Sequence, residues 1–243
     1  PTVAVIIPTY NRWPLVVRAV ESVLAQSHPA TQCVVVDDAS TDNTPALLRE
    51  KFGARSGLTR DDWRRHNVDV FMEQTYRAIK AAKPKVKFGI SPFGIWKSGV
   101  TAGTRGLDAT QQLYADALKW FQSGWVDYLA PQLYWSIAAP EQSFPVLLKW
   151  WAAQNTAARH LWPGISSASI GPSGRNAEEI IQQLKLIRAQ AGAGGSLQWS
   201  FRALHQNRDG LAVKLLRQIN TTPALVPASP WLDATVPERP VVA

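Results

Sequence analysis

The chain has 243 residues, of which 46% are hydrophobic and 18% are charged, a composition that predicts a globular protein with its own core and excludes fibrous and disordered classes. No apolar run reaches the roughly 18 to 20 residues that cross a bilayer, so we expect no membrane span, and the opening residues do not resemble a signal peptide, which predicts a cytoplasmic protein. The net charge is +8, but the basic residues alternate with acids along predicted helices, which favours solvated faces over a nucleic-acid site.

The first part of the chain predicts two βα units. Residues 3–8 form a short β-branched strand, and residues 14–26 carry apolar side chains at helical spacing. Residues 32–37 predict a second strand, and residues 44–51 a second helix. Because each strand leads into a helix, we expect the strands to run parallel and to present their carboxyl ends to the same crevice.

Three motifs in this segment resemble the start of family 2 glycosyltransferases of the GT-A fold: PTYNR at residues 8–12, ESVLAQS at 21–27 and VVVDDASTDNT at 34–44. The resemblance implies that Tyr10 stacks near the base of a nucleotide sugar. It also implies that Asp38 accepts hydrogen bonds from the base or ribose, with Asp37 beside it. No later DxD motif follows to hold a divalent cation, so we do not expect nucleotide-sugar transfer by this chain alone.

Beyond a junction near residues 53–57, helices and strands continue to alternate. Thr59 predicts an N-cap for the first of these helices. Helices are expected at residues 59–82, 108–123, 140–154, 176–191 and 209–220, and strands at residues 87–91, 126–134, 161–166 and 196–201. This alternation indicates a parallel sheet or barrel. The proline-rich tail from residue 221 predicts an extended linker or a ragged end.

The stretch WVDYLAPQLYW, residues 125–135, is the centre of the predicted site. It suits a buried parallel strand and becomes polar and aromatic at its C-terminal end. Binding groups of a βα barrel lie at the carboxyl ends of the strands, so we expect Gln132, Tyr134 and Trp135 to contact a sugar. The alternative is a core strand whose large side chains only fill space. The 11 tryptophans, against 7 phenylalanines and 5 tyrosines, also suit a carbohydrate cleft.

A second resemblance covers residues 58–220. DWRRHNV at residues 62–68, KFGISPFGIW at 87–96, YADALKWFQSGWVDYLAPQLYW at 114–135 and LLKWW at 147–151 are similar to the glycoside-hydrolase-like family 10 barrels. The resemblance implies a sugar-facing mouth lined by Ser91, Trp96, Gln132, Tyr134, Trp135 and Trp199. It begins partway through that family's barrel. The strand expected to carry the catalytic acids should precede Leu58, where the glycosyltransferase-like segment stands instead.

Few acids are left for hydrolysis, which usually needs two carboxyl groups roughly 5 to 10 Å apart. Asp127 stands at the start of its strand and is expected to be structural, and Glu141 is expected in the first turn of a helix. The remaining catalytic candidates are Asp37 and Asp38, on the hypothesis that the first segment replaces the missing barrel strands; otherwise the catalytic residues stay unassigned. The histidine spacing and the single cysteine, Cys33, predict neither a metal site nor a cofactor.

These patterns predict an α/β fold of parallel βα units, an incomplete or chimeric TIM-barrel-like structure with about six strands. Its parts are residues 1–53, residues 58–220 and the proline-rich tail 221–243. The leading hypothesis is a carbohydrate-active, hydrolase-like barrel fragment that binds or acts on glycans and is catalytically incomplete. The alternatives are a non-catalytic sugar-binding or scaffold fusion and a nucleotide-sugar-binding glycosyltransferase remnant. Carbohydrate is the expected partner, nucleotide sugar is the second, and open sheet edges predict homodimers.

Overall fold

The computed structural model describes residues 3–28, 30, 32–52, 58–171 and 174–235. The chain divides into two compact units, Pro1–Leu58 and Thr59–Ala243. The predicted junction at residues 53–57 and the end of the tail, residues 236–243, lie outside the described residues.

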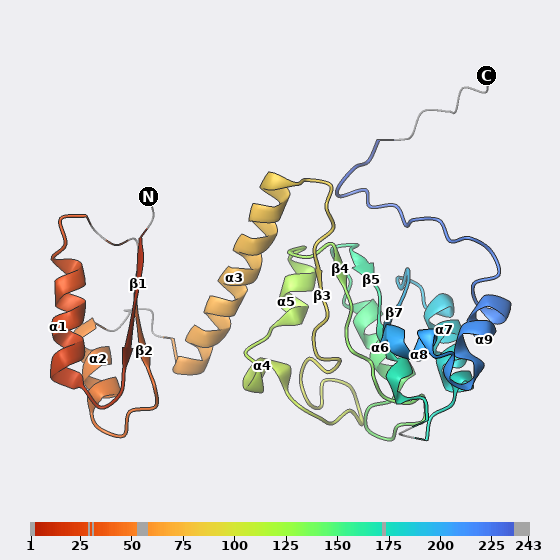
Figure 1. The fold of residues 1–243 in the computed structure, drawn as a ribbon, viewed down its shortest axis with the longest axis horizontal. Helices are drawn as coiled ribbons and strands as arrows, with labels where there is room; N and C mark the ends of the chain where they lie inside the picture. The colour runs from red at the N-terminus through yellow and green to blue at the C-terminus, as the bar shows by residue number, and fades with distance from the viewer. Residues whose placement is uncertain (1–2, 29, 31, 53–57, 172–173, 236–243) are drawn as a thin grey trace. The chain divides into compact units, whose positions relative to one another are not determined.

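The first unit is a two-stranded parallel sheet with two helices (Figure 1). Its elements are strand β1, Ala4–Thr9, helix α1, Trp13–Leu24, strand β2, Gln32–Asp37, and helix α2, Thr44–Phe52. The strands pair in parallel from Ala4 opposite Gln32 to Thr9 opposite Asp37, so the βαβα prediction is confirmed. The loops that follow β1 and β2 therefore leave the sheet at the same edge.

The second unit begins with helix α3, Arg60–Ala82. The Thr59 hydroxyl oxygen accepts a hydrogen bond from the Asp62 backbone N–H at 3.1 Å, which confirms the predicted N-cap. Asp61 and Asp62 occupy the first turn, where acids stabilise the positive end of the helix dipole. Lys83 follows the helix as its C-cap, because the residue before a proline, here Pro84, is disfavoured in helical conformation.

The described residues of the second unit form five short parallel strands. They are β3, Gly89–Ile90, β4, Tyr128–Leu129, β5, His160–Leu161, β6, Gly164–Ser166, and β7, Leu197–Trp199. Strands β3, β4 and β5 form one sheet, and β6 pairs with β7. The pairing continues beyond β4, where Gly164 N–H donates to Pro131 O at 2.8 Å and Leu133 N–H donates to Gly164 O at 3.0 Å.

The predicted strand at residues 161–166 is therefore present as β5 and β6, separated by Trp162 and Pro163. A proline has no N–H to donate to the sheet, which explains the interruption. The described strands form open sheets rather than a closed barrel. In Figure 1 the elements α3, β3, β4, β5 and β7 follow one another across the second unit from left to right.

Of the later predicted helices, α7, Ala177–Ala189, and α9, Leu211–Gln218, lie within their predicted ranges, and α6, Phe144–Ala153, begins four residues after its predicted start. Two regions differ more. The single helix predicted at residues 108–123 is instead two, α4, Ala109–Gln112, and α5, Ala117–Gln122. Tyr114 between them has a positive φ of 53°, and Asp116 caps the second helix. Helix α8, Phe201–His205, was not predicted, because it lies within a turn-rich connection.

The core of the second unit lies where the helices cover the sheet. Alternate strand residues such as Leu129, Leu161 and Ile165 are fully buried and pack in one cluster with Phe121 and Trp151. Alternation sends the neighbouring residues of each strand to the other face. None of the described helices is both long and apolar enough to cross a bilayer.

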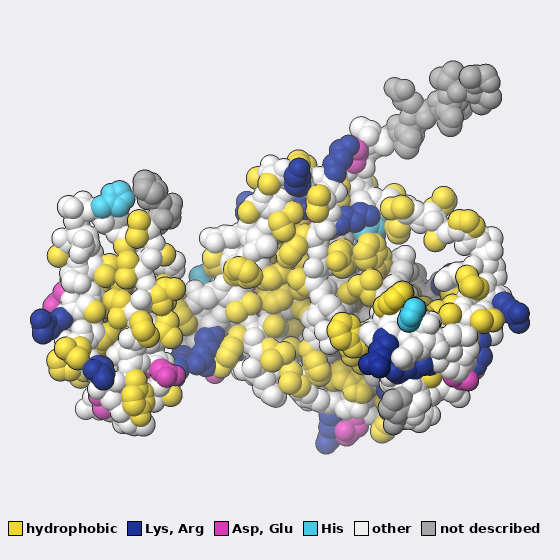
Figure 2. All heavy atoms as spheres, in the orientation of Figure 1, with side chains coloured by type: hydrophobic (Ala, Val, Ile, Leu, Met, Phe, Trp, Pro, Cys, Tyr) yellow, Lys and Arg dark blue, Asp and Glu magenta, His cyan; other side chains and the backbone are white. Residues whose placement is uncertain are grey.

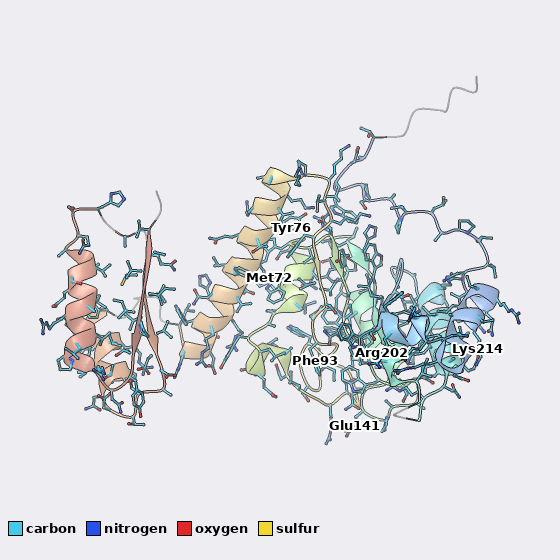
Figure 3. All side chains as sticks on the ribbon, viewed as in Figure 1. Met72, Tyr76, Phe93, Glu141, Arg202 and Lys214 are labelled. Atoms are coloured by element: carbon cyan, nitrogen blue, oxygen red, sulfur yellow. The ribbon has the colours of Figure 1, made fainter. Side chains whose placement is uncertain are left out.

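One buried carboxylate joins α3, the sheet and the tail. The Asp127 side chain is fully buried and accepts hydrogen bonds from Lys80 Nζ, from Tyr76 OH at 3.2 Å and from the Phe88 N–H at 2.7 Å. Tyr76 and Met72 are labelled on the sheet-facing side of α3 in Figure 3. Burial raises the pKa of Asp127, but the hydrogen bonds from Lys80 and Phe88 outweigh it, and the pKa lies below its ordinary value. The predicted structural role of Asp127 follows.

The tail is extended, as predicted, and its described part is also attached. The Trp231 indole N–H donates to Asp127 Oδ1 at 2.8 Å, and the Trp231 ring meets the His160 ring edge-on at 4.8 Å. Lys85 Nζ pairs with Asp233 Oδ2 at 2.7 Å. These contacts lie at the amino-terminal ends of β4 and β5, opposite the edge where βα barrels bind their ligands.

Replacing Asp127 should strongly destabilise the second unit. The change Asp127→Asn leaves the Lys80 ammonium buried without its counter-charge, so we expect a loss of about 3 kcal/mol in the free energy of unfolding by urea at neutral pH. The control is Glu73→Gln, which breaks the exposed Arg77–Glu73 pair on the same helix and should cost at most about 1 kcal/mol.

The effect should also depend on pH. A carboxylate whose pKa is lowered on folding stabilises the protein above its unfolded-state pKa and loses that contribution as the pH falls through its folded-state pKa. The difference between wild type and Asp127→Asn should therefore shrink in acid. Equal stabilities for the two proteins at neutral pH would contradict the role assigned to Asp127.

Candidate functional site

The candidate site occupies one face of the second unit's sheet, at its carboxyl edge. Gly89 pairs with Tyr128, and Ser166 pairs with Trp199. Because side chains alternate along a strand, Ser91, Gln132 and Trp199 fall on the face opposite the buried residues Leu129 and Ile165. The structure thus brings three predicted site residues to the same face from three strands.

Gln132 is the central residue of this face. It forms isolated bridges to Phe93 on one side and to Gly164 on the other. Its side-chain amide donates from Nε2 to the Ser91 carbonyl oxygen at 3.0 Å, so the predicted neighbours Ser91 and Gln132 are in contact. The half-buried amide is held at one end, while its carbonyl oxygen has no hydrogen-bond partner among the described residues and can accept one from a ligand.

Tyr134 and Trp135 extend the site along the chain. The Tyr134 ring lies 3.2 Å from where a Cβ would stand on Gly164, so the absence of a side chain there makes room for the phenol. Burial raises the pKa of Tyr134, which keeps the hydroxyl protonated and able to donate a hydrogen bond. Trp135 meets the Phe93 ring edge-on at 5.5 Å, and its carbonyl oxygen accepts from Gln183 Nε2 at 3.0 Å.

The two other predicted tryptophans differ in accessibility. The Trp96 indole N–H donates to Asp116 Oδ1 at 2.9 Å, and its ring stacks on Trp150 at 6.0 Å. Trp96 is therefore held within the helix layer, because its N–H and one ring face are already engaged. Trp199 is 62% exposed at the end of β7 and offers a flat aromatic surface.

Sequence reasoning missed an aromatic pair farther along the same face. Tyr128 stacks on Trp162 with ring centroids 4.6 Å apart, and Trp162 lies two residues beyond His160, the partner of Tyr128. The alternation that groups Tyr128 with Gln132 would have identified Tyr128. Trp162 could not be placed in the same way, because Pro163 interrupts its strand.

The acids in the loops after these strands are engaged in structural contacts. Asp108 and Asp116 cap α4 and α5. The prediction that Glu141 lies in the first turn of a helix is wrong, because α6 begins at Phe144 with a proline in its first turn; Glu141 lies in the preceding loop and pairs with Arg105 at 3.7 Å. Figure 2 shows hydrophobic side chains across the middle of the visible face of the second unit, with acidic ones at its rim.

The first unit places its own predicted residues at one edge. Tyr10 and Asp38 follow the paired ends of β1 and β2, and the Asp38 N–H donates to Thr9 O at 2.8 Å. Tyr10 is 51% exposed. Asp37 is engaged locally, since its carboxylate accepts hydrogen bonds from the Ser40 hydroxyl and from the Ser40 N–H at 3.2 Å. The two loops are tied together by Asn11, whose N–H donates to Ser40 Oγ at 2.8 Å and whose Oδ1 accepts from Thr41 N–H at 2.7 Å.

Asp37 and Asp38 lie in the first unit, whereas Gln132 and Tyr134 lie in the second. The hypothesis that these acids serve the sugar-facing mouth as catalytic groups therefore stays a prediction. Among the described residues, no group of three or more histidine, cysteine, aspartate or glutamate side chains could hold a metal ion.

Comparison with known proteins decides the family. The model of the family described as Glycosyl hydrolase-like 10 matches residues 36–181, which is more than half of the chain. The chain belongs to the glycosyl hydrolase-like 10 family. The resemblance predicted for residues 58–220 is thereby confirmed.

Two curated glycosyl hydrolases match this chain over only part of their own length. The glycosyl hydrolase YngK of Bacillus subtilis is 39% identical over 204 residues, which is 79% of this chain and 39% of YngK. The glycosyl hydrolase DigH of Escherichia coli K12 is 37% identical over 115 residues, 45% of this chain and 26% of DigH. The chain thus spans well under half the length of these glycosyl hydrolase-like 10 relatives.

The resemblance to glycosyltransferases is also confirmed, over a short segment. The putative teichuronic acid biosynthesis glycosyltransferase TuaG of Bacillus subtilis is 46% identical over 50 residues, 21% of this chain and 20% of TuaG. This member of the glycosyl hydrolase-like 10 family therefore carries a segment that is similar to a second class of carbohydrate-related protein.

The close packing around Gln132 predicts that the site depends on Gly94. A methyl group on Gly94 would lie 2.3 Å from the Gln132 carbonyl oxygen and 2.8 Å from the Trp135 ring. Gly94→Ala should therefore displace the segment that follows β4 and cost about 1–3 kcal/mol of unfolding free energy, measured in urea. In the control Gly194→Ala, the nearest atom is Trp162 Nε1 at 3.8 Å, an ordinary contact. Equal stabilities for the two variants would contradict this packing.

Proposed function

We propose that the second unit is the carboxyl-terminal part of a TIM-type barrel that binds glycans and lacks a catalytic carboxylate pair of its own. The observation that carries this proposal is that Gln132 and Trp199 share one face at the carboxyl edge of the sheet, with the Tyr134 ring against Gly164, the residue that bridges to Gln132. Family membership supports carbohydrate as the ligand class.

The chemistry of these side chains suits a sugar. A pyranose ring presents apolar C–H groups on its faces and hydroxyl groups at its rim, so an indole can stack on the ring while an amide and a phenol bind hydroxyls. The Trp199 surface is accessible, and the amide of Gln132 is oriented by Ser91. Trp96 is left out of the proposed contacts, because its N–H and one ring face are engaged by Asp116 and Trp150.

We propose no hydrolysis because the acids in the loops after the strands are engaged in other contacts. Hydrolysis needs a pair of carboxyl groups across the scissile bond, whereas Asp108, Asp116 and Glu141 are engaged in helix caps or an ion pair. If β5 and β6 are counted as one interrupted strand, the described residues of the second unit form four strands. A closed TIM barrel has eight. Open sheet edges of this kind are the basis on which we propose self-association into homodimers.

Glycan binding should depend on Trp199. We expect chitohexaose, cellohexaose or xylohexaose to bind, as measured by isothermal titration calorimetry, and Trp199→Ala to weaken binding at least about tenfold through loss of stacking. The control Trp63→Ala removes an indole that is 46% exposed on α3, away from the site, and should leave the affinity unchanged.

Aryl glycosides should not be turned over above the buffer rate. Turnover would contradict the proposed lack of catalytic carboxylates. If none of the three oligosaccharides binds, the second unit does not bind neutral glycans; if acidic sugars fail to bind as well, the sugar-binding proposal fails and a scaffold role takes its place.

A second function, nucleotide-sugar binding by the first unit, is favoured by the link that Asn11 makes between the loops carrying Tyr10 and Asp38. Uridine diphosphate glucose at ten times its dissociation constant should then stabilise this unit by about 1.4 kcal/mol. Asp38→Asn should abolish that stabilisation, whereas Glu50→Gln, an exposed acid on α2, should preserve it. Thermal unfolding with and without the nucleotide sugar measures the effect, and identical curves would exclude this function.

A further inference from the structure

An open hollow lies beyond the last two strands of the second unit, at the same edge of the sheet as Gln132 and Trp199. Its volume is about 470 Å³, within the range of small-molecule sites. Its walls come from the loop that follows β6 and the loop that precedes α9. We refer to it as the arginine pocket, lined by Ile170, Gly171, Arg175, Asn176, Arg208 and Asp209.

Both arginines are half-buried and held in place by neutral partners. Arg208 donates from Nη1 to the Ala168 carbonyl oxygen at 3.1 Å and from Nε to Gln206 Oε1 at 3.0 Å. Arg175 donates from Nη1 to Ser169 Oγ at 3.2 Å. Neither arginine forms an ion pair with an acid of the described residues. Each guanidinium therefore keeps N–H donors and a positive charge without a counter-charge.

The acid in the same pocket is already engaged. Asp209 Oδ2 accepts from the Ala177 N–H at 2.7 Å and lies 3.4 Å from Lys214 Nζ. The hydrogen bond from Ala177 lowers the pKa of Asp209, with Lys214 contributing, so the group is a carboxylate at neutral pH. It neutralises part of the charge of the pocket and leaves the arginines unpaired.

The start of α7 is likewise occupied. The Ala177 N–H is bound by Asp209, and the Glu179 N–H donates to Asn176 Oδ1 at 3.0 Å. Phosphate sites of TIM barrels commonly use the free N–H groups of a helix start near the last strands. Here the N–H groups of Ala177 and Glu179 already have partners, so we assign binding to the two guanidiniums.

The lining carries an excess of positive charge. Two arginines face one aspartate, and that aspartate also has Lys214 Nζ at 3.4 Å, so the site favours an anion. A planar carboxylate also fits the planar, forked donors of arginine.

We propose that the arginine pocket is a binding subsite for the carboxylate of an acidic sugar, so that the glycan held by the second unit contains uronic-acid-like residues. This inference rests on the proposed glycan-binding function and specifies its ligand class. Arg175 and Arg208 bind the carboxylate, while Trp199 and Gln132, at the same sheet edge, contact sugar rings.

Three sugars that differ only at C6 test the subsite. Glucuronate carries a carboxylate there, glucose a hydroxymethyl group and glucose 6-phosphate a phosphate. We expect glucuronate to bind at least about tenfold more tightly than the other two, as measured by ligand-observed NMR titration, because a charge-assisted hydrogen bond is gained.

Substitutions distinguish binding in the arginine pocket from nonspecific attraction of an anion to a basic protein. Arg175→Gln and Arg208→Gln should each weaken glucuronate binding about tenfold. Arg202→Gln removes the same charge from α8, outside the pocket lining (labelled in Figure 3), and should leave it unchanged. Arg208 also donates to the Ala168 backbone, so circular dichroism should check that Arg208→Gln is folded. Arg175→Gln loses only a side-chain hydrogen bond and tests the subsite without that concern.

The outcomes are distinguishable. Equal binding of glucuronate and glucose, or equal losses in Arg175→Gln and Arg202→Gln, would overturn the subsite. Preference for glucose 6-phosphate would overturn it in favour of a phosphorylated ligand. If neutral oligosaccharides still bind in a Trp199-dependent way while glucuronate does not, only the subsite fails. Failure of both classes to bind overturns the glycan-binding proposal with it.

Discussion

The buried carboxylate of Asp127 is the interaction on which the second unit depends. It accepts hydrogen bonds from α3 through Lys80 and Tyr76, from the backbone before β3 at Phe88, and from the tail through Trp231. A buried charge is tolerated only when it is paired and hydrogen-bonded. The cluster therefore fixes the amino-terminal end of the sheet and leaves the carboxyl edge, with its loops, for binding.

Several carboxylates of the second unit serve structure. Asp108 and Asp116 start helices, Glu141 pairs with Arg105, and Asp209 binds the first N–H of α7. The positively charged and aromatic groups keep more of their capacity for ligands, as Arg175, Arg208 and Trp199 do. The proposed glycan binding and its acidic subsite rest on these groups.

Much of the fold was predictable, because local patterns decide it. The βαβα order of the first unit, the N-cap Thr59 and the helices α6, α7 and α9 follow from periodicity and capping residues. Where the structure differs from the predicted elements, a single residue is responsible. Tyr114 adopts a left-handed conformation, so one predicted helix is two, and Pro163 interrupts a predicted strand. A tyrosine gives no local sign of a left-handed conformation, whereas Pro163 does break the strand because it has no N–H to donate.

The sequence by itself determined the element types, the parallel arrangement and the polar, aromatic character of residues 125–135, since these depend on neighbours along the chain. Only the tertiary structure decided that Ser91, Gln132 and Trp199 share a face, that Trp96 is engaged with Asp116 and Trp150, and that Arg175 and Arg208 line one open hollow. These facts depend on strand register and on loops that meet from distant parts of the chain, and no local pattern encodes such meetings.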